Sequence, residues 1–199
     1  MQFDSLTFLS QAQWLGTTPV HTLKDGTLSV FAEADTDVLT DPLTGAVRNN
    51  AAVALVDPPS GDWQFSARLR VGFRAPWDAG ALFVRSDRDH WAKVNFEQAP
   101  DGAPSVYSVV TRGRSDDAVG RPVDGGALWL RISRVDGAFA FHASSDGTTW
   151  RLVRQFDLGP DREVRVGIAA QSPVGKGCRV DFDSIRLTRT RLAHLFDGR

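Results

Sequence analysis

The chain has 199 residues, with 23 lysines and arginines against 24 aspartates and glutamates, and it contains one cysteine and six tryptophans. This length fits one large domain, a size that β-sandwiches commonly reach. The formal net charge of -1 offers no basic excess for nucleic acid or an anionic membrane, so we expect neither as a partner. A single cysteine excludes an internal disulfide and a multi-cysteine zinc site.

The N-terminal residues lack the features of a secretory signal, because an acid stands at Asp4 and no basic residue lies near the start. The longest apolar run, Ala51 to Val56, is far shorter than the ~18–20 residues that a membrane span needs. We therefore expect a cytoplasmic protein.

Turn signals recur about every ten residues along the chain. Glycine supplies positive φ and aspartate bonds its own backbone, so Asp-Gly pairs such as Asp25-Gly26 and Asp136-Gly137 close hairpins easily. Between them apolar and polar residues alternate, for example from Trp63 to Val71. This pattern predicts an all-β fold, a single antiparallel β-sandwich or jelly roll over residues 1–187. Residues 188–199 are expected to form a C-terminal appendage, in which only Thr190 to Phe196 allows a helix.

The side-chain period of two also assigns each strand residue to a face. In the strand expected over 91–97, the apolar residues Ala92, Val94 and Phe96 point to the core. The same reasoning places the following residues on the face opposite the core: Phe83, Arg85, Trp91, Lys93, Asn95, Glu97, Trp129, Arg131, Ser133, His142 and Ser144.

If these strands are neighbours in one sheet, a single face carries tryptophans, charged groups and a histidine together. An indole packs against the C–H face of a sugar, while charged and amide groups bond its hydroxyls. We therefore expect a saccharide or other polar small molecule to bind the concave sheet face, at Trp91, Lys93, Glu97, Trp129, Arg131 and His142. The plain alternative is a solvated sheet with cross-strand ion pairs.

Catalysis is a second possibility, with Glu97 as general acid or base and Lys93 polarising a sugar substrate in a hydrolase or isomerase. A glycosidase needs two carboxyls, and only Asp78 and Asp116 are candidates for the second. The chain has no nucleophile elbow, zinc-protease motif or phosphate loop, so we expect no cofactor.

Several acidic residues lie in turns and on a late strand, and their oxygens would suit calcium. They are Asp35, Asp37, Asp41, Asp181 and Asp183, with Asn49 and Asn50 nearby. Their spacing is not that of an EF-hand loop, so we expect no metal.

A series of ordered motifs runs from Asp35 to Leu187. They are Thr36-Asp37, Asp41-Pro42-Leu43-Thr44-Gly45, Asp78-Ala79-Gly80, Trp91-x-Lys93-x-x-x-Glu97, Ser108-Val109-Val110-Thr111-Arg112-Gly113-x-Ser115-Asp116, Leu130-Arg131, Ser145-Asp146-Gly147 with Trp150, and Ser172-Pro173-x-Gly175-x-Gly177. In this order they resemble the domain-of-unknown-function family of concanavalin A-like sandwiches that includes the regulator-of-enolase protein.

The resemblance implies a jelly-roll sandwich similar to lectins and to accessory domains of some β-xylosidases. It also implies that Arg112, Ser115 and Asp116 join the candidate ligand-binding residues. The family's functionally named member implies a third possibility, a regulatory domain that binds another protein.

Overall fold

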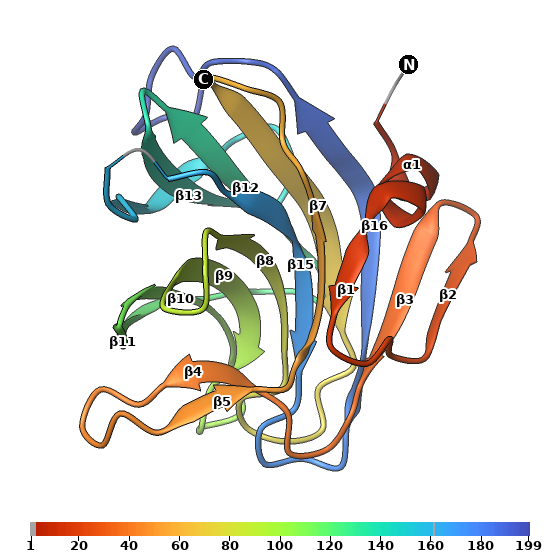
Figure 1. Ribbon diagram of the computed structural model, residues 1–199. Coiled ribbons are helices and arrows are strands. Elements are labelled where there is room, and N and C mark those ends of the chain that lie inside the picture. Colours follow the sequence, from red (N-terminus) through yellow and green to blue (C-terminus); the bar gives the residue numbers. More distant parts are fainter. Residues whose placement is uncertain (1–2, 161) are drawn as a thin grey trace.

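The computed structural model describes residues 3–160 and 162–199, within which one helix and sixteen strands form (Figure 1). Sheet A has the order β1 (Gln13–Leu15), β6 (Ala52–Val56), β15 (Arg165–Gln171), β8 (Ala79–Arg85), β9 (His90–Gln98), β10 (Pro104–Arg112) and β11 (Arg114–Pro122). Sheet B has the order β14 (Arg151–Phe156), β13 (Ala138–Ser144), β12 (Leu128–Val135), β7 (Trp63–Val71), β16 (Cys178–Thr188), β3 (Thr27–Ala32) and β2 (His21–Lys24). The remaining strands, β4 (Val38–Thr40) and β5 (Val47–Asn49), pair with each other as a hairpin. The expected antiparallel sandwich in one domain is confirmed.

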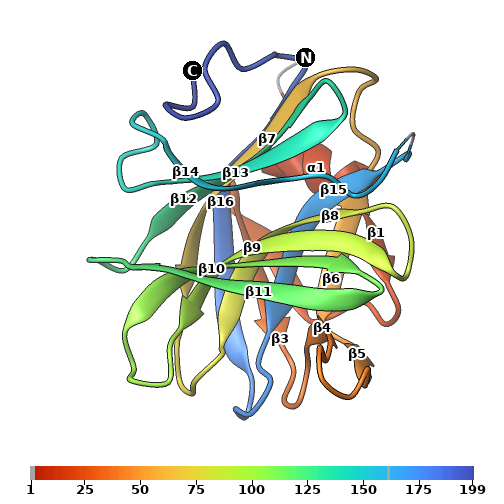
Figure 2. The same ribbon diagram turned by 90° about the vertical axis from the view of Figure 1, so that its left-hand side faces the viewer.

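The two sheets pack face to face around the main core (Figure 2). Strand β7 shows how the sequence forms it, because Phe65, Ala67 and Leu69 are fully buried while the residues between them are partly exposed. In β9, Ala92, Val94 and Phe96 also lie in this core, as the alternation predicts. Each large apolar side chain buried in this way contributes about 1.5–3 kcal/mol.

A second, smaller apolar cluster lies on the outer face of sheet A, next to the β4–β5 hairpin. It contains Trp91 and Phe83, whose rings stack with centroids 5.4 Å apart, together with Val38 of β4. Strands β8 and β9 are therefore buried on both faces, and their burial is nearly continuous rather than alternating.

The helix found in the described part of the chain is not in the segment where the sequence allows one. Residues 190–196 contain turns instead of a helix, and a short helix, α1 (Ser5–Gln11), lies near the N-terminus. Asp4 caps α1 by accepting a hydrogen bond from the Thr7 amide at 2.8 Å, and Phe8 is fully buried. Seven residues give too little periodicity for this helix to stand out in the sequence. No helix in the described part of the chain has the length and hydropathy to cross a membrane.

The expectation that all the candidate residues share one face is also wrong. Strand β9, with Trp91, Lys93 and Glu97, belongs to sheet A, whereas β12 and β13, with Arg131 and His142, belong to sheet B. Alternation identifies the side of a strand that faces away from the core, but long-range pairing decides which sheet the strand joins. The two sets therefore lie on opposite outer faces of the sandwich.

Candidate functional site

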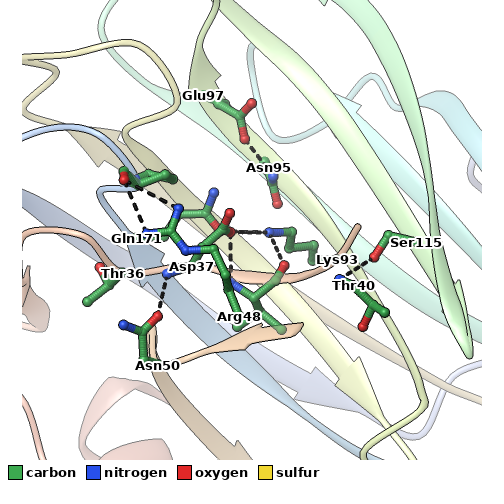
Figure 3. A network of polar contacts seen from close by, with 12 residues as sticks. Thr36, Asp37, Thr40, Arg48, Asn50, Lys93, Asn95, Glu97, Ser115 and Gln171 are labelled. Atoms are coloured by element: carbon green, nitrogen blue, oxygen red, sulfur yellow. Dashed lines mark hydrogen bonds and ion pairs between the residues drawn. The ribbon is translucent and has the colours of Figure 1, made fainter. Parts of the chain in front are cut away.

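The outer face of sheet A carries a buried lysine that fixes the β4–β5 hairpin in place (Figure 3). Lys93 is 2% exposed, and its Nζ donates to the Val38 carbonyl at 2.7 Å and to Gln171 Oε1 at 2.7 Å. A third acceptor, Asp37 Oδ1, lies 3.3 Å away. Because all three acceptors come from the protein, Lys93 holds the hairpin and the end of β15 against β9 and has no N–H left to polarise a substrate.

The same strand places Asn95 and Glu97 beyond Lys93, and these two residues form the polar centre of the site (Figure 3). Asn95 Nδ2 donates to Glu97 Oε2 at 2.7 Å. The side chains are 1% and 5% exposed, yet Asn95 Oδ1 is buried with no partner within the described residues. Their neighbours in β8 are Ala81 and Ala79, which have small side chains.

Burial raises the pKa of Glu97 to about 7, although Lys93 and the Asn95 hydrogen bond act in the opposite direction. Asp37 and Asp117 add to the rise through their negative charges. A carboxyl with a pKa near neutrality can exchange a proton at physiological pH, which suits both hydrogen bonding to a ligand and general acid–base chemistry.

Two aromatic residues flank this polar centre. Tyr107 pairs with Asn95 in the register of β10 and β9, and burial and the charge of Glu97 raise its pKa. The Trp77 ring lies edge-on to the Tyr107 ring, with centroids 6.0 Å apart, and Trp77 is 36% exposed. The site therefore combines a carboxyl, an amide, a phenol and a partly exposed indole.

Trp77 has a φ of 71°, which is strained for a bulky residue. The surrounding loop maintains this conformation, because the Trp77 amide donates to the Gln98 carbonyl at 2.8 Å. The fully buried Asp78 accepts hydrogen bonds from the Arg74 and Ala75 amides and, at 2.6 Å, from Ser172 Oγ. Asp78 is thus a structural anchor for the indole rather than a second catalytic acid.

Other residues expected at the site are engaged by the protein itself. Trp91 is 3% exposed and stacked on Phe83, so little of its ring is open to a ligand. Ser115 Oγ accepts from the Thr40 amide at 2.9 Å and thereby ties the hairpin to β11. Arg112 and Asp116 form ion pairs with Asp157 and Arg154, at 3.7 and 3.0 Å.

Trp129, Arg131 and His142 lie on the outer face of sheet B. The half-buried Trp129 has the Arg68 guanidinium 5.7 Å from its ring centre. Arg131 and His142 are covered by the C-terminal segment, residues 189–199, whose carbonyls they contact. These residues form a separate cluster from the Asn95–Glu97 pair.

The acidic turn residues have local structural partners. Asp41 Oδ1 accepts from the Leu43 and Thr44 amides, and Asp37 bonds the Val38 amide as well as Lys93. Among residues 3–160 and 162–199, no three histidine, cysteine or acidic side chains come together in a way that could hold a metal ion.

Sequence reasoning did not select Asn95, Tyr107 and Trp77 as ligand-binding residues. Alternation places Asn95 on the same face of the strand as Glu97, two residues away, so the sequence pattern could have identified it as a candidate. Trp77 lies in a loop, where no periodicity applies, and its positive φ has no signature in the sequence.

Residues 14–190 match the family model described as "Protein of unknown function (DUF1349)". The chain belongs to the DUF1349 family. This confirms the resemblance seen in the ordered motifs. No curated protein matches the chain significantly.

Solved structures similar to this DUF1349 protein include a functionally unknown protein from Saccharomyces cerevisiae. It has a TM-score of 0.83 and 27% identity over 92% of this chain and 98% of the yeast chain. The GH43 protein BlXynB from Bacillus licheniformis has a TM-score of 0.74 and 16% identity; the match covers 90% of this chain but only 37% of BlXynB. Lectin I-B4 from Griffonia simplicifolia has a TM-score of 0.55 and 15% identity over 90% and 93% of the two chains. The last two establish a shared fold.

The contacts of Lys93 predict that its replacement destabilises the fold. Lys93→Met leaves the Asp37 carboxylate buried without its ammonium partner, which should lower the free energy of unfolding by about 3–5 kcal/mol. The double variant Lys93→Met/Asp37→Asn should recover part of the loss, as measured by urea denaturation. Wild-type stability in Lys93→Met would contradict the structural role.

The raised pKa of Glu97 predicts a specific pH dependence. The fold favours the protonated carboxyl, so wild-type stability should decrease as pH rises from about 4.5 to about 7 and then level off. Glu97→Gln stays neutral, and its stability relative to wild type should increase across this window by up to about 3 kcal/mol. Urea denaturation at several pH values measures the difference, with Glu33→Gln at an exposed carboxyl as control. Equal pH profiles for the two variants would refute the burial effect.

Proposed function

We propose that this DUF1349 protein binds a saccharide or a similar polar small molecule at Asn95, Glu97, Tyr107 and Trp77. The observation that carries the proposal is the buried Asn95 Oδ1, which has no hydrogen-bond partner among the described residues, beside a carboxyl whose hydrogen bond comes from Asn95 itself. Leaving a buried acceptor unpaired costs about 1–3 kcal/mol, and a ligand hydroxyl would remove that cost.

The groups at the site have complementary roles toward a sugar. Asn95 Oδ1 accepts from one hydroxyl, and the free oxygen of Glu97 exchanges hydrogen bonds with a neighbouring one. The exposed part of the Trp77 indole offers an apolar surface for the C–H face of the ring. An uncharged, hydroxylated ligand fits this set better than a polyanion, because the negative charges of Asp37 and Asp117 already act on Glu97 and raise its pKa.

The similarity in fold to sugar-related proteins also supports the proposal, without identifying a particular sugar. The lectin and the GH43 protein are similar to this chain in structure, and another similar structure is described as a xylan β-1,4-xylosidase from Bacillus halodurans. Xylo-oligosaccharides are therefore the first probes to test.

A glycan array followed by titration calorimetry with the bound sugar, beginning with xylo-oligosaccharides, tests the proposal. Trp77→Ala and Asn95→Ala should each weaken binding about tenfold or more, because they remove the apolar surface and the unpaired acceptor. Phe196→Ala truncates another exposed aromatic, on the C-terminal segment, and should leave the affinity unchanged. Absence of binding to any sugar, or equal affinities for all four proteins, would contradict the proposal.

A hydrolase or isomerase is the second candidate, supported by the pKa of about 7 that burial gives Glu97. Asp117, whose pKa is also raised by burial, is the candidate for a second acid. Asp37 and Asp117 both act on Glu97 through their charges, but Asp37 is paired with Lys93. Turnover of aryl β-xylosides that is abolished by Glu97→Gln would favour this candidate, whereas sugar binding without turnover would favour a binding module.

A further inference from the structure

The outer face of sheet B holds a second group of buried polar side chains, far from the Asn95–Glu97 pair in the topology. Arg131 of β12 and His142 of β13 are directly paired in register, and Ser133 follows on the same face of β12. They are 6%, 0% and 0% exposed. The C-terminal segment, residues 189–199, lies on this side of the sandwich (Figure 2).

Arg131 is a buried cation without an acidic partner. No described carboxylate lies within ion-pair distance of its guanidinium, which stacks 4.2 Å from the centre of the Trp150 ring. Burial lowers its pKa to about 10, with no compensating negative charge. Removing an arginine from water costs several kcal/mol unless a counter-charge and full hydrogen bonding replace the solvent.

The hydrogen bonds of Arg131 are incomplete in a specific way. Its Nη2 donates to the Gly198 carbonyl at 2.6 Å, while the adjacent Nε is buried and has no hydrogen-bond partner in residues 3–160 and 162–199. In a guanidinium group, the Nε–H and one Nη–H point side by side and match the two oxygens of a carboxylate. A single carbonyl oxygen satisfies only half of this edge and leaves the charge uncompensated.

The surrounding groups are unsatisfied as well. His142 Nε2 donates to the Leu195 carbonyl at 2.6 Å. Its Nδ1 and Ser133 Oγ are both buried, and neither has a hydrogen-bond partner in the part of the chain that the structure describes. Burial lowers the pKa of His142 to about 4, and the nearby Arg131 adds to this effect, so the ring is neutral at pH 7. The C-terminal segment therefore covers this patch without satisfying three of its buried polar atoms, as counted among the described residues.

The segment is held at Gly198, which has a φ of 70°. A Cβ at this position would meet Arg131 Nη2 and would lie 2.6 Å from the Trp150 Cβ. Only glycine fits between these side chains without a shift of the segment or of its neighbours.

We propose that Arg131 anchors a second binding site, which takes the carboxylate of a small organic acid in place of the Gly198 carbonyl. The carboxylate oxygens accept from Nε and Nη2 and neutralise the buried charge. Residues 196–199 move away from Trp150 when the acid binds, and the segment therefore competes with the ligand. This site is independent of the saccharide site proposed on sheet A.

Acetate is the probe for this site, with chloride at the same ionic strength as reference and inorganic phosphate as the alternative oxyanion. In the full chain at pH 7, NMR should show the Arg131 Nε–H signal shifting with acetate, and acetate should raise the melting temperature. Arg131→Lys keeps the charge but loses the paired donors, so it should abolish the thermal shift. Arg68→Lys, at a partly exposed arginine paired with Asp183, should retain it.

Gly198→Ala provides a second test that does not depend on the folding of Arg131→Lys. Because it dislodges the competing segment, it should increase the affinity for acetate about tenfold. An unchanged or weaker affinity in Gly198→Ala, or equal thermal shifts in Arg131→Lys and wild type, would overturn the proposal. A larger response to phosphate than to acetate would overturn the assignment to a carboxylate.

Discussion

The buried ammonium group of Lys93 is the constraint on which the arrangement of sheet A depends. An ammonium removed from water needs acceptors in place of its hydration shell, and here they come from Asp37, Val38 and Gln171. Meeting this requirement fixes the hairpin and the end of β15 against β9. The hairpin then covers Trp91 and Phe83, which creates the second apolar cluster, and the buried polar pair Asn95 and Glu97 lies farther along the same strand.

The local features of the fold could be predicted from the sequence, because alternation depends only on neighbouring residues. The inward positions of Ala92, Val94 and Phe96 and the outward position of Lys93 follow directly from it. What it could not provide is the partner of Lys93, since Asp37 is 56 residues away along the chain. For the same reason Arg131 could be assigned to an outer face but not to sheet B, and the Trp77 conformation depends on a loop held by distant contacts.

The two outer faces of the sandwich share one structural feature, although their side chains differ. On each, a segment outside the sandwich covers the sheet and supplies backbone carbonyls to a buried cation: Val38 to Lys93 on sheet A and Gly198 to Arg131 on sheet B. On sheet A, Lys93 has three acceptors, and Asn95 Oδ1 beyond it is buried with no partner among the described residues. On sheet B the cation itself, Arg131, keeps an Nε–H that no described residue accepts, so the unmet polar group is an acceptor on one face and a charged donor on the other.

The strand order has a consequence for how the protein is made. Strand β15 lies between β6 and β8 in sheet A, and β16 lies between β7 and β3 in sheet B, although both come from the last part of the chain. A nascent chain that ends before residue 165 therefore lacks an interior strand of each sheet. Without β15, strand β6 is not connected to β8, and without β16, strand β3 is not connected to β7. Neither sheet is continuous until β15 and β16 have been synthesised, so the sandwich folds only after both of these strands have left the ribosome.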